Sequence, residues 1–170
     1  MEKKIIEWFR IESELSNAKT YPGWPFQVWC TINEKKIKDI LDEVRKKSTP
    51  GESYSEFLKK AEEIKVKFCE KTTTGEPDLE GSGENRRYKF SEENKKDFDK
   101  EITKLNKENE SIIAEYSDMI NKYLEYITTD SFDIDIKLLN SKNIPEEYFQ
   151  EHPDKSLSFL NVCLDLVNIE

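Results

Sequence analysis

Histidine and cysteine are scarce in this sequence, and their scarcity removes most of the usual catalytic and metal-binding arrangements. The only histidine, His152, precedes Pro153 in an acidic stretch, so we interpret it as a surface loop residue. The three cysteines, Cys30, Cys69 and Cys163, are odd in number and far apart. Zinc sites and histidine-based triads therefore lack components, and a disulfide framework is not expected. A reducing, cytoplasmic compartment is the expected location.

Glycine is also scarce, and its five occurrences do not form a phosphate-binding loop. Gly81 and Gly83 are not followed by the Lys-Ser/Thr pair that such a loop requires. Asp133 and Asp135 alternate with apolar residues, with Asp130 nearby, but the rest of a calcium loop is missing. We interpret them as the solvated face of a strand. We therefore expect no enzymatic activity, no cofactor and no metal site.

Long apolar runs are absent from the sequence as well. The chain is charged from its second residue, Glu2, and no window approaches the length of a membrane span. We expect neither a signal peptide nor a membrane anchor.

Positive charge is in deficit, and the deficit is concentrated near the C-terminus. The 170 residues carry a formal net charge of −9, and residues 128–170 hold nine Asp and Glu against three Lys, a net of −6. Duplex recognition depends on neutralising phosphates with Lys and Arg, so direct nucleic-acid binding is not expected. The acidic segment instead predicts a protein partner with a basic surface.

The strongest positive signal is a heptad pattern between residues 98 and 126. Its members recur at spacings of four and three, which predicts one long helix with a partner along one stripe. They are Phe98, Ile102, Leu105, Asn109, Ile112, Tyr116, Met119, Tyr123 and Tyr126. Asn109 is the one polar member and falls at an a position, where a buried Asn fixes register.

The N-terminal part predicts two helices separated by a turn. Ile5, Trp8, Phe9 and Leu15 indicate a short amphipathic helix that ends before the YPGWP turn at residues 21–25. Pro25 suits the first position of the next helix. The polar residues 33–36 interrupt the apolar face of this second helix, and Thr31 and Glu34 have capping-box spacing, so the helix either continues or restarts there.

A further helix should begin after the STPG break at residues 48–51. Ser53 and Glu56 have capping-box spacing. The apolar stripe that follows consists of Phe57, Ala61, Ile64 and Phe68, and it should pack antiparallel to the long helix. Residues 70–90 predict a tip that is either irregular or a hairpin with strands near 69–73 and 87–90. Ser91 should cap the long helix.

Alternating apolar and charged residues at 132–138 predict a half-buried strand. Its partner should be the C-terminus or another subunit, because an unpaired edge invites pairing. Pro145 should lead into a short helix at residues 146–150. The last apolar residues fit a helix (Leu157, Leu160, Leu164 and Val167) or a strand (160–166), and we favour the helix.

Together these patterns predict an α-dominated α+β protein built on a long, coiled-coil-like antiparallel helical hairpin with a tip excursion and a small mixed base. Residues 1–170 are expected to form a single domain. Residues 1–52 would supply the helices of the base, 53–127 the hairpin with its tip at 70–90, and 128–170 an acidic strand and helix element.

The order of several short motifs resembles an uncharacterised family of small proteins encoded by phages and prophages of low-GC bacteria. The motifs are PFQVW (residues 25–29), EKTTTGEP (70–77), YKFSEEN (88–94) and DIDIK (133–137). The likeness covers most of residues 20–170 and implies an accessory protein of a mobile element, acting in the cytoplasm of a bacterial host cell. It implies no functional residues. The hairpin with a tip is also similar in architecture to prefoldin-like chaperone subunits.

Aromatic residues are concentrated near the N-terminus, at Trp8, Phe9, Tyr21, Trp24, Phe26 and Trp29. We interpret them as core, with an aromatic anchor for a partner as the alternative.

Two functions remain open: an acidic inhibitor of a host defence nuclease or another nucleic-acid-handling factor, and a virion-assembly chaperone or adaptor that grips another phage protein through its hairpin. Self-association through the hairpin or the strand edge is a further option. The candidate partner-binding residues are Asp130, Asp133, Asp135, Glu146, Glu147, Glu151, Asp154, Arg86 and Arg87.

Overall fold

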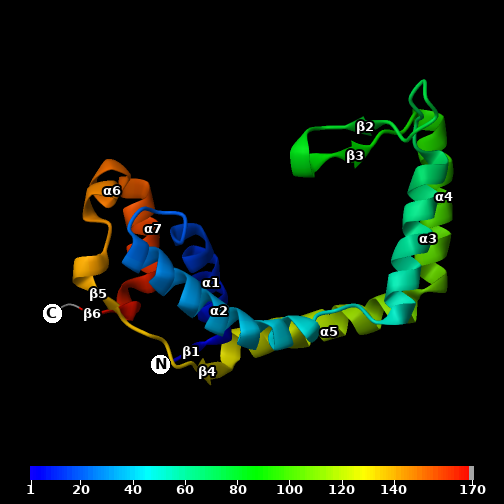
Figure 1. Ribbon diagram of the computed structural model, residues 1–170. Helices are drawn as coiled ribbons and strands as arrows, with labels where there is room; N and C mark the ends of the chain where they lie inside the picture. Colours follow the sequence, from blue (N-terminus) through cyan, green and yellow to red (C-terminus); the bar gives the residue numbers. More distant parts are fainter. Residues whose placement is uncertain (169–170) are drawn as a thin grey trace. The chain divides into compact units, whose positions relative to one another are not determined.

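Helices dominate the computed structural model, which describes residues 1–168 of the chain. They make up 69% of it, and the strands are short, so the predicted α-dominated α+β class is confirmed. Two compact units are present (Figure 1). The terminal unit consists of Met1–Thr49 and the residues from Asn121 onward, and the central unit is Pro50–Ile120.

The core of the terminal unit forms around three helices, α1 (Ile5–Ala18), α2 (Trp24–Lys46) and α7 (Pro153–Cys163). Helix α1 packs against both α2 and α7. Its buried apolar residues recur every three or four positions, and they are Ile5, Trp8, Ile11, Leu15 and Ala18. The aromatic cluster is mostly core, as predicted: Trp8, Tyr21, Phe26 and Trp29 are buried. Phe9 is half-buried against them, and Trp24 lies exposed.

Helix α2 is continuous, so the restart at Thr31 does not occur. Pro25 lies in its first turn, as its fixed backbone angle favours. The hydroxyl of Thr31 donates to the carbonyl of Gln27 within the helix and caps nothing. Asn33, which reads as a polar interruption in the sequence, is fully buried and hydrogen-bonded to the backbone of Lys137.

The predicted strand at residues 132–138 is only partly formed. Strand β4 (Ser131–Asp133) pairs antiparallel with β1 (Glu2–Lys4), and this pairing ends one residue later, where Ile134 and Met1 exchange hydrogen bonds of 3.0 and 2.8 Å. The prediction that the C-terminus or another subunit supplies the partner is wrong, because the N-terminal segment does so. Beyond β4 the apolar alternation persists, with Ile134 and Ile136 buried. There the side chains of Trp29 and Asn33 on α2, rather than a neighbouring strand, form hydrogen bonds with the backbone of Lys137.

The favoured C-terminal helix forms, but it ends at Cys163 and buries a different face; the prediction is wrong for Leu164, which lies in a 3-10 turn, and for Val167, which lies in a strand. After β5 (Leu139–Asn140), α6 (Glu146–Glu151) follows Pro145 as predicted, and β6 (Val167–Asn168) pairs parallel with β5. Helix α7 buries Phe159 and Cys163, and Leu166 is buried just after it. The leucines that led to the helix prediction, Leu157, Leu160 and Leu164, are 63%, 37% and 52% exposed.

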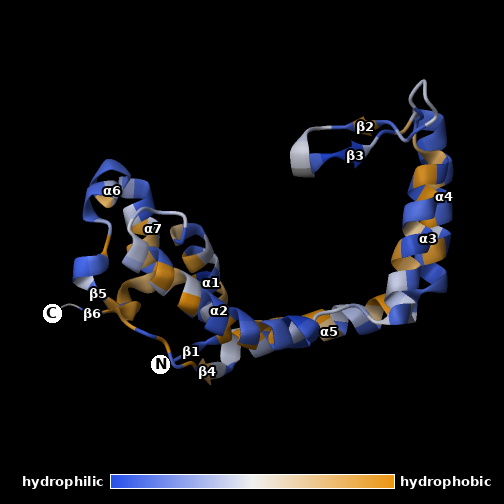
Figure 2. Cartoon of the chain, viewed as in Figure 1, coloured by the Kyte–Doolittle hydropathy of each residue, from blue (hydrophilic) through white to orange (hydrophobic). Residues whose placement is uncertain are grey.

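The central unit contains α3 (Glu52–Phe68) and α4 (Glu92–Glu108), which pack side by side (Figure 2). Its core is small: Phe57, Ala61 and Leu105 are buried, with half-buried Tyr54, Ile64, Ile102 and Ile113 against them. Ser91 caps α4 by accepting from the amide of Asn94, as predicted. The capping box at Ser53 and Glu56 is wrong, because α3 starts earlier, after Gly51.

Beyond these helices, β2 (Leu79–Glu80) and β3 (Arg87–Tyr88) form a two-stranded hairpin. The predicted strand near residues 69–73 is wrong, although the amide of Glu70 does donate to the carbonyl of Lys89 at 2.7 Å. Gly81 turns the chain at φ +93°, where a Cβ would lie 2.5 Å from the carbonyl oxygen of Asn85. Only glycine suits that position.

The predicted long helix is interrupted at Asn109, which separates α4 from α5 (Glu110–Thr129). The backbone of Asn109 lies at φ −116° and ψ 22°, and its side-chain amide donates to the carbonyl of Leu105 at 2.8 Å. An Asn side chain that bonds the neighbouring backbone in this way competes with the helical conformation. Asn109 therefore ends a helix rather than setting the register of one.

Candidate functional site

The candidate partner-binding residues fall into three separate groups. Asp130, Asp133 and Asp135 lie at or beside β4, at the end of the terminal unit opposite to α6 (Figure 1). Glu146, Glu147, Glu151 and Asp154 lie together on α6 and in the first turn of α7. Arg86 and Arg87 belong to the hairpin of the central unit. The structure thus gathers only the four carboxylates of α6 and α7.

The carboxylates around β4 already have cationic neighbours. Asp133 Oδ1 lies 2.6 Å from the amino group of Met1, and Asp135 Oδ2 lies 3.5 Å from Lys36 Nζ. The carbonyl of Asp130 accepts from the amide of Ile5 at 3.0 Å, where α1 begins. Asp130 and Asp133 therefore join the N-terminal segment to β4, whereas Asp135 contacts α2.

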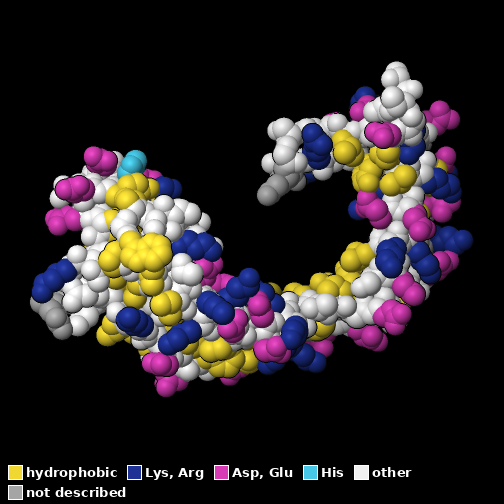
Figure 3. Space-filling view, viewed as in Figure 1, with side chains coloured by type: hydrophobic (Ala, Val, Ile, Leu, Met, Phe, Trp, Pro, Cys, Tyr) yellow, Lys and Arg dark blue, Asp and Glu magenta, His cyan; other side chains and the backbone are white. Residues whose placement is uncertain are grey.

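The four carboxylates of α6 and α7, which we call the acidic patch, are all exposed and little neutralised (Figure 3). Among the described residues, the one ion pair in the patch joins Lys155 to Asp154, at 3.7 Å. Glu146 accepts from the side-chain amide of Gln150 at 3.4 Å. The patch therefore presents net negative charge to solvent.

One turn after Asp154 of the acidic patch, an exposed apolar stripe begins that consists of Leu157, Leu160 and Leu164, and we call it the leucine face. Sequence reasoning found the spacing of this stripe and missed that a second stripe runs along the same helix. Phe159, Cys163 and Leu166 have the same four-and-three spacing, and the Phe159 ring packs against Phe26 at a centroid distance of 5.3 Å. Because the aromatic stripe fills the core, the leucines face outward.

A second exposed apolar surface surrounds Trp24, which is 77% exposed. Two hollows flank it, of about 340 and 430 Å³. Both include Val28 and Ile32, and the first also includes Leu138. Of the predicted aromatic anchors, Trp24 is the one that a partner could reach.

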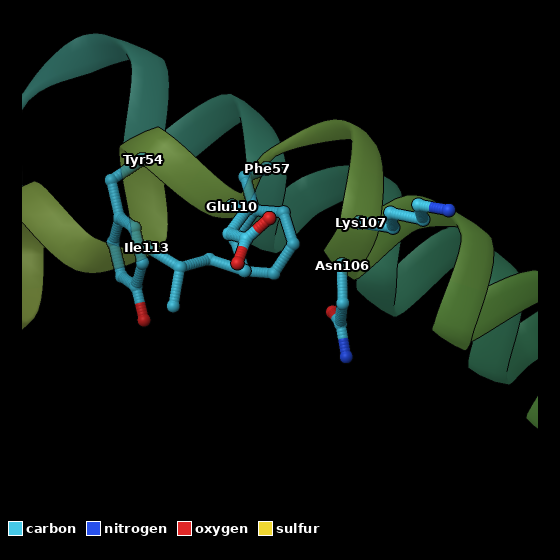
Figure 4. Close-up of a pocket in the computed structure, with 6 residues that line it drawn as sticks. All are labelled: Tyr54, Phe57, Asn106, Lys107, Glu110 and Ile113. Carbon is cyan, nitrogen blue, oxygen red and sulfur yellow. The ribbon is translucent and has the colours of Figure 1, made fainter.

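The central unit has a wide hollow of about 580 Å³ near the α4–α5 break (Figure 4). Its lining residues are Tyr54, Phe57, Asn106, Lys107, Glu110 and Ile113. Tyr54 and Ile113 lie side by side there, whereas Lys107 points away. The Tyr54 ring stacks on Tyr116 at 3.8 Å. The hollow is therefore lined by aromatic and aliphatic side chains and by one charged residue of each sign, Lys107 and Glu110.

The histidine and the cysteines take structural positions. His152 is exposed, and its ring lies 4.4 Å from that of Tyr148. Cys30, Cys69 and Cys163 are buried free thiols. Desolvation raises the pKa of Cys30 to about 12 and also raises that of Cys163. Among residues 1–168, no group of three or more His, Cys, Asp or Glu side chains is placed to hold a metal ion.

Comparison of the chain with protein-family models, with characterised proteins and with solved structures finds no match. Within the described residues, no helix combines the length and apolar character that a membrane crossing requires. The terminal unit is therefore interpreted from its own surface: a helical scaffold that carries an acidic patch next to a leucine face.

Proposed function

We propose that this chain is a non-enzymatic protein-binding protein that engages a basic partner through the acidic patch and the leucine face. The observation that carries the proposal is that α7 holds the exposed Leu157 and Leu160 on the same helix as Asp154 of the acidic patch, which precedes Leu157 by one turn, and that exposed Leu164 directly follows the helix. Protein interfaces combine an apolar centre with a polar rim, and a few large side chains supply most of the affinity.

The leucine face supplies the apolar centre of this surface. Burying a leucine side chain that is otherwise exposed contributes about 1.5–3 kcal/mol. Leu157 and Leu164 are each more than half exposed, so a partner that covers them gains much of that amount. Clustered exposed apolar side chains of this kind mark interaction sites.

The acidic patch makes binding selective for partners with a basic surface. Opposite charge speeds encounter and disfavours partners of the wrong sign. A nucleic-acid-handling protein offers a suitable surface, because its binding channel is basic. Together with the likeness to phage-encoded proteins, this favours an inhibitor that occupies such a channel, for example that of a host defence nuclease, in the bacterial cytoplasm.

The proposal is tested by capturing partners with the wild type and with a Leu157→Ser/Leu160→Ser variant, and then reconstituting binding with the purified partner. Leu58→Ser is the matched control, because Leu58 is an exposed leucine on α3 of the central unit. We expect a basic protein whose binding falls at least tenfold in the double variant, falls between 50 and 500 mM salt, and is unchanged in the control. A partner that binds all three proteins equally overturns the assignment.

The second candidate function is an assembly chaperone or adaptor that uses α3 and α4 as a helical hairpin. It is favoured by the exposed Leu58 and Leu79 of the central unit and by Arg86 and Arg87 at the start of β3. For this function the expected effects of the two variants on binding are exchanged: Leu58→Ser would weaken binding, and the Leu157→Ser/Leu160→Ser variant would not. Copurification with a structural protein of the virion would support this function.

A further inference from the structure

Glu14 of α1 is a carboxylate that is only half satisfied by the protein. The residue is 8% exposed, and its Oε2 accepts from the hydroxyl of Ser158 on α7 at 2.8 Å. Its Oε1 is buried without a hydrogen-bond partner among the described residues. A buried charged oxygen without a donor costs more than a neutral one, because the lost hydration is not replaced. Glu14 therefore needs a donor that the described protein groups do not provide.

Glu14 lines a polar cavity of about 580 Å³ in the terminal unit. The cavity lies among α1, the turn that follows it, α6 and α7. Its other lining residues are Ser16, Asn17, Thr20, Tyr21, Tyr148, Asp154, Lys155 and Ser158. A half-satisfied carboxylate thus adjoins a space that is large enough for a small ligand.

The aromatic and charged groups around this cavity favour a cation. The rings of Tyr21 and Tyr148 lie 5.0 Å apart, and aromatic faces attract cations. Burial raises the pKa of Tyr21, and the negative charge of Glu14 raises it further, so the phenol remains neutral. Asp154 adds a second carboxylate, and the one cation in the lining, Lys155, lies 3.7 Å from Asp154.

We propose that this cavity binds a primary ammonium group, with Glu14 as its principal acceptor. A guanidinium ion binds a carboxylate best through two parallel hydrogen bonds, which need both oxygens. In Glu14 one oxygen is already held by Ser158, so the single remaining oxygen suits the compact ammonium ion. The terminal torsion of a glutamate is soft, so the carboxylate can turn its free oxygen toward an entering donor. The hydroxyls and the Asn17 amide oxygen of the lining offer further acceptors.

The proposal does not rest on the proposed function: the leucine face does not line this cavity, and the cavity shares one residue, Asp154, with the acidic patch. The probes are putrescine, a free amine, and Nα-acetyl-lysine methylamide, an ammonium on a neutral peptide group. Nα,Nε-diacetyl-lysine methylamide is the uncharged control, and butylguanidinium tests selectivity. Binding is followed by calorimetry and by NMR shifts of the residues that line the cavity.

We expect at least one ammonium probe to bind, the uncharged control not to bind, and butylguanidinium to bind more weakly. The two ammonium probes distinguish a free amine from a lysine side chain as the source. Glu14→Gln should weaken binding at least about tenfold, the size of a charge-assisted hydrogen bond. Glu147→Gln removes the same charge outside the cavity and should leave binding within roughly twofold. Equal weakening by both variants, or no binding of either ammonium probe, overturns the proposal.

A second variant keeps the test informative if Glu14→Gln does not fold. Ser158→Ala frees Oε2 of Glu14, so butylguanidinium should gain affinity relative to putrescine. Lys155→Gln removes the competing cation and should strengthen ammonium binding. An unchanged ratio in Ser158→Ala, or weaker binding in Lys155→Gln, contradicts the assigned geometry.

Discussion

Asn33 on α2 holds the backbone of Lys137 through both ends of its side-chain amide. Its Nδ2 donates to the carbonyl of Lys137 at 2.8 Å, and its Oδ1 accepts from the amide of Lys137 at 3.1 Å. The indole of Trp29 donates to the same carbonyl. A helix side chain therefore does here what a neighbouring strand would do in a sheet, and it fixes the segment that joins β4 to β5.

Replacing Asn33 should destabilise the terminal unit. Asn33→Leu conserves volume but leaves the amide of Lys137 without a partner, so we expect a loss of about 1–3 kcal/mol in the free energy of unfolding. Urea unfolding followed by circular dichroism measures the loss. Asn143→Leu changes an exposed Asn in the same way and should cost less than about 0.5 kcal/mol. Equal losses in the two variants would show that the Lys137 contacts do not contribute.

Alkaline pH should destabilise the fold through Cys30 and Cys163. Burial raises the pKa of both thiols above the usual 9.0, that of Cys30 to about 12. Their contribution to stability is complete below pH 9 and is lost as the pH rises from there, because the unfolded chain releases the protons first. We expect a loss of about 1 kcal/mol per thiol by pH 10. The Cys30→Ala/Cys163→Ala variant should show a correspondingly shallower decline between pH 8 and pH 10; a decline as steep as that of the wild type would contradict the assignment.

The break between α4 and α5 should depend on the side chain of Asn109. In Asn109→Leu the bond to the carbonyl of Leu105 is lost and the heptad stripe becomes fully apolar, so we expect one continuous helix. Backbone Cα chemical shifts of residues 108–110 report the change. Asn106→Leu, one turn earlier and exposed, should leave the break in place. Persistence of the break in Asn109→Leu would assign it to the packing of the helices instead.

The two stripes of α7 should respond differently to truncation. Phe159→Ala removes a fully buried ring that packs against Phe26 and Trp29, and should cost about 3–5 kcal/mol. Leu157→Ala removes a mostly exposed side chain and should change stability by less than about 0.5 kcal/mol. Thermal unfolding of the two variants separates these outcomes. A large cost for Leu157→Ala would mean that the leucine face is already covered within the chain.

Local signals in the sequence predicted several elements of this fold. The amphipathic spacing of α1, Pro25 at the start of α2, Ser91 at the start of α4 and Pro145 before α6 each act within one or two turns of backbone. Their outcomes depend little on the rest of the chain, so the sequence alone was sufficient.

The sequence-based predictions failed where contacts between residues far apart in the chain determine the structure. Asn33 reads as an interruption until Lys137, 104 residues away, supplies its hydrogen bonds. Two stripes on α7 have equal periodicity, and only the core contributed by Phe26 and Trp29 selects Phe159 over Leu157. The acidic composition indicated a charged surface, but only the fold shows that α6 and α7 bring four of those carboxylates together.

The central claim, that this chain binds a basic protein through the leucine face, is tested most directly by site-specific photo-crosslinking. A benzophenone amino acid is placed at position 160 on α7 or, as control, at position 59 on α3, in the cells that naturally make the protein. We predict one cross-linked basic protein from position 160, reduced by high salt, and none from position 59. No cross-link from position 160, the same product from both positions, or a cross-link to a second copy of this chain would contradict the account.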